Sequence, residues 1–329
     1  MDFFSNLMLA LLLASSANFG LALAPTKSFT TASGLPVSRY GLGGAARTTQ
    51  PSCLVPLYVD QIKKKKENGA PFLFYYNPRR YPEFMSGIKQ ICSTENRENL
   101  FVASGGHDIS TNGLDQRLSD CLEYCGKEYL DLFILEYILP NELEDEVGGH
   151  SSSLKPGPKL VSALKHTQTW LKNGSVRYIG LSTHSHMVGK VMSYCPEIDV
   201  LMLRYGMSHK DAAETISFPA AKENGKATIA FTSTRWNALQ NGTDDVQFDD
   251  APTSADCLSF VFGSESSPSP VDAVLHSARD EDELIESMSG LRKLSEEEER
   301  KWRKYGEIFE VSNDDNFDEF PEERLLSIV

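Results

Sequence analysis

Residues 130–137 read LDLFILEY and place a run of apolar residues directly before a carboxylate. The apolar residues from Leu132 to Leu135 are typical of a strand that is buried on both faces, as in a parallel sheet. Glu136 follows at the point where the chain should leave the core. It is therefore either a solvated strand end or a side chain that faces a functional site.

Seven further strand-like runs occur along the chain, with helical or ambiguous segments between them. These runs cover residues 36–43, 71–77, 100–104, 176–182, 200–205, 227–232 and 272–277. Asn173-Gly174 is a typical stop for the helix that precedes the run at 176–182. Strands that alternate with helices require crossover connections and hence a parallel sheet. Eight such units in about 250 residues predict an α/β fold of the (β/α)8 TIM barrel type.

An open, doubly wound sheet is the alternative that such units also allow. Residues 41–46 formally match the GxGxxA pattern of dinucleotide-binding sheets. However, the segment before this match is a poor buried strand, and the segment after it is a turn rather than a helix start. The match lacks its structural context, so the barrel is favoured. In a barrel of this kind, functional side chains lie at the C-terminal ends of the strands.

Composition and spacing exclude several classes of partner. The net charge of −14 argues against a nucleic-acid partner, which would require a basic face. The six cysteines are scattered and do not indicate a zinc site or a disulfide framework. His184 and His186 have no carboxylate or cysteine at matching spacing, so we expect no metal.

The N-terminal segment is typical of a targeting signal. Residues 1–24 are largely apolar and end in Ala22-Leu-Ala24, which is typical of a signal-peptide cleavage site. Residues 25–35 are rich in Ser and Thr, and we expect a processed or flexible leader. Together these segments resemble the two-part plastid address of algae with secondary plastids. We predict a secretory-pathway signal with a plastid as one destination, and no membrane association after processing. Residues 36–311 would then form the barrel, and residues 312–329 an acidic tail.

Six segments, in the same order, resemble the aldo-keto reductase family over most of residues 34–310. They are GLPVSRYGLGG (34–44), NRENLFVAS (96–104), YLDLFILEY (129–137), WLKNGSVRYIGLSTHS (170–185), LRYGMSHKDAAETISFPAAKENGKATIAFT (203–232) and SARDEDELIESM (277–288). The resemblance implies a (β/α)8 barrel. It also implies an NAD(P)-dependent oxidoreductase that acts on a small-molecule carbonyl substrate.

The resemblance matches the family's catalytic residues only in part. In the family, NADPH transfers hydride to a carbonyl and a tyrosine donates the proton, with support from a lysine, an aspartate and a histidine. Tyr81 is the candidate for the tyrosine, with Tyr75 and Tyr76 as rivals. Gly105 stands at the lysine position, and Glu136 stands at the histidine position. A nearby lysine charge would make the phenol a better acid, so its loss predicts slow reduction.

Two interpretations of this site remain open. The aspartate position falls on Phe74 or Tyr75, and neither is an acid. One branch of the family carries Glu in place of the histidine, where a protonated carboxyl polarises the substrate. The candidate catalytic residues are therefore Tyr81 and Glu136. The alternative is a non-catalytic barrel of the same family with a binding or regulatory role.

The resemblance also implies five cofactor-binding residues. Ser182 matches the serine of a Ser-Asn pair that binds the nicotinamide amide, and Thr183 replaces the asparagine. Tyr205 matches a tyrosine that stacks on the nicotinamide ring. Ser233 falls in a loop that contacts the pyrophosphate, and Arg279 matches a residue that contacts the adenosine 2′-phosphate. We therefore expect weakened binding of NADP(H), and the sequence does not indicate an oligomeric state.

Overall fold

The computed structural model describes residues 25–26, 28–44, 50–64, 69–75, 81–125, 129–145, 154–242, 251–264, 266–267 and 269–310. The predicted targeting segment and the predicted acidic tail lie outside these ranges. Among the helices of the described residues, none is long and apolar enough to cross a membrane.

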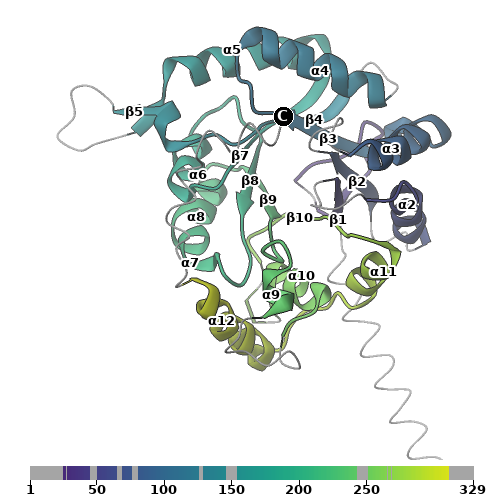
Figure 1. The fold of residues 1–329 in the computed structure, drawn as a ribbon. Helices are drawn as coiled ribbons and strands as arrows, with labels where there is room; N and C mark the ends of the chain where they lie inside the picture. The colour runs from purple at the N-terminus through teal and green to yellow at the C-terminus, as the bar shows by residue number, and fades with distance from the viewer. Residues whose placement is uncertain are drawn as a thin grey trace, which may run out of the picture.

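Within the described residues, eight parallel strands close into a barrel in the order β1-β10-β9-β8-β7-β4-β3-β2 (Figure 1). They are β1 (Val37–Gly44), β2 (Ala70–Tyr75), β3 (Phe101–Gly106), β4 (Leu130–Leu135), β7 (Val176–Thr183), β8 (Val200–Arg204), β9 (Ala227–Phe231) and β10 (Ala273–His276). Each strand pairs with its neighbours in parallel. The predicted (β/α)8 barrel is therefore confirmed, and the open sheet is excluded.

Helices surround the barrel (Figure 1). They are α2 (Leu54–Lys64), α3 (Pro82–Thr94), α4 (Thr111–Cys125), α5 (Pro158–Asn173), α6 (His186–Ser193), α7 (Lys210–Ala212), α8 (Phe218–Glu223), α9 (Ala238–Asn241), α10 (Ser254–Phe262), α11 (Glu281–Ser289) and α12 (Glu296–Glu310). Shorter elements are η2 (Arg97–Asn99), η3 (Pro140–Glu142), the π-helical turn η4 (Ala213–Ser217) and the hairpin β5 (Leu143–Asp145) with β6 (Leu154–Pro156). The predicted stop is confirmed, because α5 ends before Gly174, whose φ of 80° is left-handed.

The strands separate two apolar cores. Leu132 and Ile134 of β4 belong to a core inside the barrel, whereas Phe133 and Leu135 belong to the core between strands and helices. Side chains alternate between the two faces of a strand, so successive residues of β4 point in turn into the barrel and toward the helices. This alternation also shows which residues at the strand ends point into the barrel mouth.

The N-terminal end of the barrel is closed by residues that precede β1. Phe29 is 1% exposed, stacks on Phe101 with ring centroids 5.0 Å apart, and meets Phe72 edge-on at 6.0 Å. The N–H of Thr26 donates to the carbonyl of Val37 over 2.8 Å. In the described part of residues 25–35, the aromatic ring of Phe29 therefore fills the barrel end. Processing of this segment stays a prediction.

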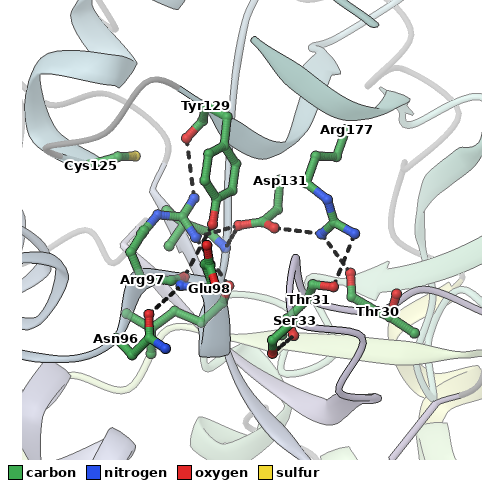
Figure 2. A network of polar contacts seen from close by, with 12 residues as sticks. Thr30, Thr31, Ser33, Asn96, Arg97, Glu98, Cys125, Tyr129, Asp131 and Arg177 are labelled. Carbon is green, nitrogen blue, oxygen red and sulfur yellow. Dashed lines mark hydrogen bonds and ion pairs between the residues drawn. The ribbon is translucent and has the colours of Figure 1, made fainter. Parts of the chain in front are cut away.

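An ion network fastens this closing segment to the barrel (Figure 2). Asp131, at the start of β4, is fully buried and lies 2.6 Å from Nη1 of Arg97 and 2.8 Å from Nη1 of Arg177. Arg177 also donates to the carbonyls of Thr30 and Thr31 over 2.8 and 3.0 Å. The network links the N-terminal segment to β4 and β7, at the end of the barrel that usually serves stability.

Candidate active site

The inner face at the C-terminal end of the barrel is formed by a few polar and aromatic side chains. Ile134 of the inner core pairs with Gly105, and Glu136 lies two residues later on the same face. Strand β7 is the other neighbour of β4. Its Ser182 pairs with Met202 of β8, which also belongs to the inner core. The predicted position of Glu136 in the barrel mouth agrees with this register.

Arg204 and Phe231 complete this inner rim. They pair with each other across β8 and β9, one strand period beyond Met202. Arg204 is 8% exposed, and Phe231 is partly buried against the inner core. The sequence interpretation did not include either residue, although the alternation of β8 and β9 places both on the inner face.

Glu136 is a buried carboxyl group without full hydrogen bonding. Its residue is 3% exposed, and its Oε1 has no hydrogen-bond partner among the described residues. Its backbone N–H donates to the carbonyl of Gly106 over 2.9 Å, which fixes the end of β4. Burial raises the pKa of Glu136 to about 8, against an opposing effect of the Arg117 charge. Glu136 therefore carries a proton at neutral pH.

Gly105 and Glu136 are sterically complementary. A Cβ atom at Gly105 would lie 2.3 Å from the carbonyl oxygen of Ile134 and 2.8 Å from both Cγ and Oε1 of Glu136. The side chain of Glu136 thus fills the space beside Gly105. A lysine at position 105, as the resemblance would require, does not fit without a shift of β4 or of Glu136.

Arg117 of α4 is the cation that the structure places beside this pair. Its Nε donates to the carbonyl oxygen of Gly105, and its Cγ lies 2.8 Å from the position of a Cβ on Gly106. The absence of a side chain at Gly106 lets the arginine stem cross the end of β3. Arg117 lies on a helix that no motif marked, so sequence reasoning missed it.

Tyr81 lies at the N-terminal cap of α3 and is 8% exposed. Its ring belongs to the outer core rather than the inner one. Of the two candidates for the aspartate position, Phe74 faces the inner core. Tyr75 faces outward and donates its hydroxyl to the carbonyl of Cys121 over 3.0 Å. The rival Tyr76 lies outside the described residues.

The predicted Ser-Thr pair holds the loop after β4. Oγ of Ser182 accepts from the N–H of Tyr137 over 3.1 Å, and Oγ1 of Thr183 donates to the carbonyl of Ile138 over 2.7 Å. Tyr137 has a left-handed φ of 56°. These bonds position the residue that follows Glu136. Ser182 faces the barrel interior, whereas Thr183 is 1% exposed and faces outward.

Tyr205 lies in the outer core and not in the barrel mouth. Its ring packs edge-on against Phe218 at 4.9 Å, and its hydroxyl donates to Oε1 of Glu214 over 2.8 Å. At the ends of β8 and β9, the aromatic ring on the inner face is that of Phe231. The alternation of Ala227, Ile229 and Phe231 is the sequence signal that points to this ring.

The last two predicted cofactor residues have protein partners. Ser233 is 3% exposed, and its Oγ donates to the carbonyl of Tyr205 over 3.2 Å. Arg279 has a half-exposed side chain, and its Nε donates to Glu283 over 2.8 Å. The structure therefore places Arg279 at the surface beside an acid that the sequence interpretation did not consider.

Three histidines gather near Arg204. Burial, followed by the Arg204 charge, lowers the pKa of His184 to about 3, of His186 to about 4 and of His209 to about 2. These imidazoles are neutral at physiological pH, so the positive charge near them belongs to Arg204 and, beside His209, also to Arg235. Among the described residues, no group of three or more His, Cys, Asp or Glu side chains could hold a metal ion.

Comparisons with solved structures show the same fold. The chain is similar to the aldo-keto reductase AKR11C1 from Bacillus halodurans in its holo form, with a TM-score of 0.62 and 16% identity over 84% of this chain and 95% of that one. The apo form of that protein gives a TM-score of 0.61 at 16% identity, over 85% and 96% of the two chains. The thermostable aldo-keto reductase Tm1743, in complex with the inhibitor epalrestat, gives 0.56 at 18% identity over 81% and 94%.

A search of curated proteins found no match. The family model described as "Aldo/keto reductase family" matches residues 80–302. This range includes the ends of β3, β4, β7, β8, β9 and β10. Because the match spans more than half of the sequence, the chain belongs to the aldo/keto reductase family.

Proposed function

We propose that this chain is an NAD(P)H-dependent oxidoreductase that slowly reduces a small carbonyl compound and uses Glu136 as its proton donor. Family membership supports the reaction class, because aldo-keto reductases are in general NAD(P)-dependent oxidoreductases. The observation that carries the proposal is Glu136 itself. It is a buried carboxyl group in the barrel mouth whose pKa is raised to about 8.

The residues of the rim fit the nicotinamide end of a dinucleotide. Phe231 offers a partly exposed ring on the inner face, and we assign to it the stacking role first predicted for Tyr205. Ser182 offers a hydroxyl on the same face. The roles of Thr183, Ser233 and Arg279 in holding the cofactor stay predictions. When bound, the reduced nicotinamide would supply a hydride to the carbonyl carbon.

Glu136 would supply the proton that balances this hydride. Its protonated carboxyl group donates to the carbonyl oxygen, and the carboxylate left behind lies near the Arg117 charge. A positioned general acid contributes a factor of about 10²–10⁴ to the rate. The shift toward a pKa near 8 keeps the acid form populated at neutral pH, where an unperturbed glutamate would be ionised.

Tyr81 remains the competing proton donor. Its ring lies in the outer core, and Gly105 offers it no lysine charge, so we rank Glu136 above it. Both assignments make the same overall reaction possible. They differ in which substitution removes it and in how the rate depends on pH.

Turnover of NADH or NADPH with a small aldehyde tests the proposal. The rate of the wild type should fall as pH rises through about 8, because Glu136 loses its proton there. Glu136→Gln keeps the shape of the side chain but cannot donate an acidic proton, and it should abolish turnover. Tyr81→Phe should retain it. An active Glu136→Gln variant together with an inactive Tyr81→Phe variant would transfer the acid role to Tyr81.

A non-catalytic barrel with a binding or regulatory role is the second candidate. The observation that favours it is the close fit of Gly105 against Glu136, which leaves no space for the family's lysine. Dinucleotide binding without turnover of any aldehyde, over the whole pH range, would support this candidate. Absence of dinucleotide binding would remove the reductase proposal entirely.

A further inference from the structure

The start of α11 is unusually acidic for a surface that would meet a phosphate. Four consecutive carboxylates, residues 280–283, follow Arg279 directly. Asp280 caps the helix, and its Oδ1 accepts from the N–H of Glu283 over 2.8 Å. A helix N-terminus ordinarily favours an anion, but here side chains of the protein already provide the negative charge.

Glu283 is the buried member of this group, and it holds Arg279. It is 7% exposed, and its Oε2 accepts from both the backbone N–H and the Nε of Arg279 over 2.9 and 2.8 Å. Its Oε1 accepts from the hydroxyl of Ser254 over 2.8 Å and lies 3.8 Å from Nε2 of His276. Burial opposes ionisation, but the hydrogen bonds from Arg279 prevail and lower the pKa of Glu283. Glu283 is therefore ionised at neutral pH.

We propose that Glu283 makes this chain bind NADH in preference to NADPH. The inference rests on the proposed function and on the predicted role of Arg279, which by the family resemblance contacts the 2′ position of the adenosine ribose. A 2′-phosphate would meet a guanidinium whose charge is already paired with Glu283 through Nε, so only the Nη groups of Arg279 would be left to bind it. It would also bring up to two negative charges toward an ionised carboxylate.

A ribose 2′-hydroxyl meets none of these obstacles. It carries no charge, and it can donate a hydrogen bond to a carboxylate. A carboxylate has about four acceptor positions, and Glu283 uses three of them for Arg279 and Ser254. An acid that accepts from the 2′-hydroxyl is also the device by which dinucleotide-binding sheets select NAD. Arg279 and Glu283, at the start of α11, therefore fit the ribose of NADH better than the 2′-phosphate of NADPH.

Fluorescence titrations of the purified protein with NADH and with NADPH test the inference without any need for turnover. The wild type should bind NADH more tightly. Glu283→Gln keeps the size of the side chain and releases the charge of Arg279, so NADPH affinity should rise about tenfold or more. NADH affinity should change by less than about threefold, because the 2′-hydroxyl is neutral.

Asp282→Asn is the matched control. Asp282 is exposed in the same helical turn, so its substitution removes one charge without touching Arg279. The ratio of NADH to NADPH affinity should stay near the wild-type value. Circular dichroism of each variant checks that the barrel is intact. Competition by ADP-ribose and by its 2′-phosphorylated form should show the same preference, because both lack the nicotinamide ring.

The outcomes separate this inference from the proposed function. Tighter binding of NADPH by the wild type, or an unchanged ratio in Glu283→Gln, would overturn the inference and leave the reductase proposal standing. Failure of both nucleotides to bind to the folded wild type would overturn both. A shift of the ratio in Asp282→Asn as large as in Glu283→Gln would also overturn the specific role of Glu283.

Discussion

Strand β4 carries a buried acid at each end, and the two acids differ in their partners. Asp131, at the N-terminal end, lies 2.6 and 2.8 Å from two guanidinium groups and accepts from the N–H of Val102 over 3.0 Å. Glu136, at the C-terminal end, has an Oε1 without a hydrogen-bond partner among the described residues. Both residues are almost fully buried.

The comparison shows that burial alone does not distinguish a structural acid from a reactive one. Asp131 is charge-compensated and hydrogen-bonded, so it serves to fix the N-terminal segment through Arg177. For Glu136, the charge of Arg117 does not offset the effect of burial, so the carboxyl group keeps its proton. A buried polar group that the protein leaves partly unsatisfied is a candidate for interaction with a ligand.

The largest expected effect concerns Asp131. Asp131→Asn would leave Arg97, whose side chain is 1% exposed, with an uncompensated buried charge. Removing one partner of a buried ion pair costs about 3–5 kcal/mol, and we expect that loss in the free energy of unfolding by urea. Glu136→Gln should cause no loss at pH 7 and should raise the free energy of unfolding, because glutamine avoids the cost of protonating a carboxylate that is ionised in the unfolded chain. Similar losses for the two variants would contradict the assignment of Asp131 as a structural acid and Glu136 as a reactive one.

The pH dependence of stability should also reveal the raised pKa of Glu136. The pKa of Glu136 is about 8 in the folded protein and near 4.5 when unfolded. Its contribution to stability is therefore complete below about pH 4.5 and is lost as pH rises through 8. The unfolding free energy of the wild type, measured against Glu136→Gln, should drop on the order of 4 kcal/mol between pH 5 and pH 9. A difference that does not change with pH would contradict the raised pKa.

A smaller effect tests the fit between Gly105 and Glu136. Gly105→Ala would press a methyl group against the carbonyl of Ile134 and against Glu136, and overpacking of this kind costs about 1–3 kcal/mol. Gly106→Ala is the control, because its methyl group would meet the flexible stem of Arg117 instead of backbone. Urea denaturation should show the greater loss for Gly105→Ala. A greater loss for Gly106→Ala would mean that the end of β3 adapts more easily than its geometry indicates.

Much of the fold could be predicted because it depends on local pattern. The apolar run of β4 and the helix stop at Gly174 follow from buried parallel strands and from left-handed backbone geometry. The place of Glu136 also followed from its position at a strand end. Phe29 could not be predicted as a plug, because its packing depends on the closure of strands distant in the sequence.

The parts of the site that were missed depend on side-chain direction and on long-range contacts. Tyr205 and Phe231 lie at the ends of neighbouring strands, and the alternation along β8 and β9 shows which ring faces inward once one face of each strand is known to line the barrel. Arg117 reaches the site from α4, so its role depends on how that helix is rotated against β3. The pairing of Arg279 with Glu283 depends on rotamers that no motif specifies.

The protonation state of Glu136 in the folded protein decides whether this residue can be the proton donor. Carbon-13 NMR of side-chain carboxyl groups, recorded against pH for the wild type and for Glu136→Gln, identifies the resonance that the substitution removes. We predict that this resonance titrates near pH 8, as expected for a buried carboxyl group poised to donate a proton. A resonance that titrates near the ordinary glutamate value of about 4.3 would show that Glu136 is ionised at neutral pH, and would contradict its assignment as the proton donor.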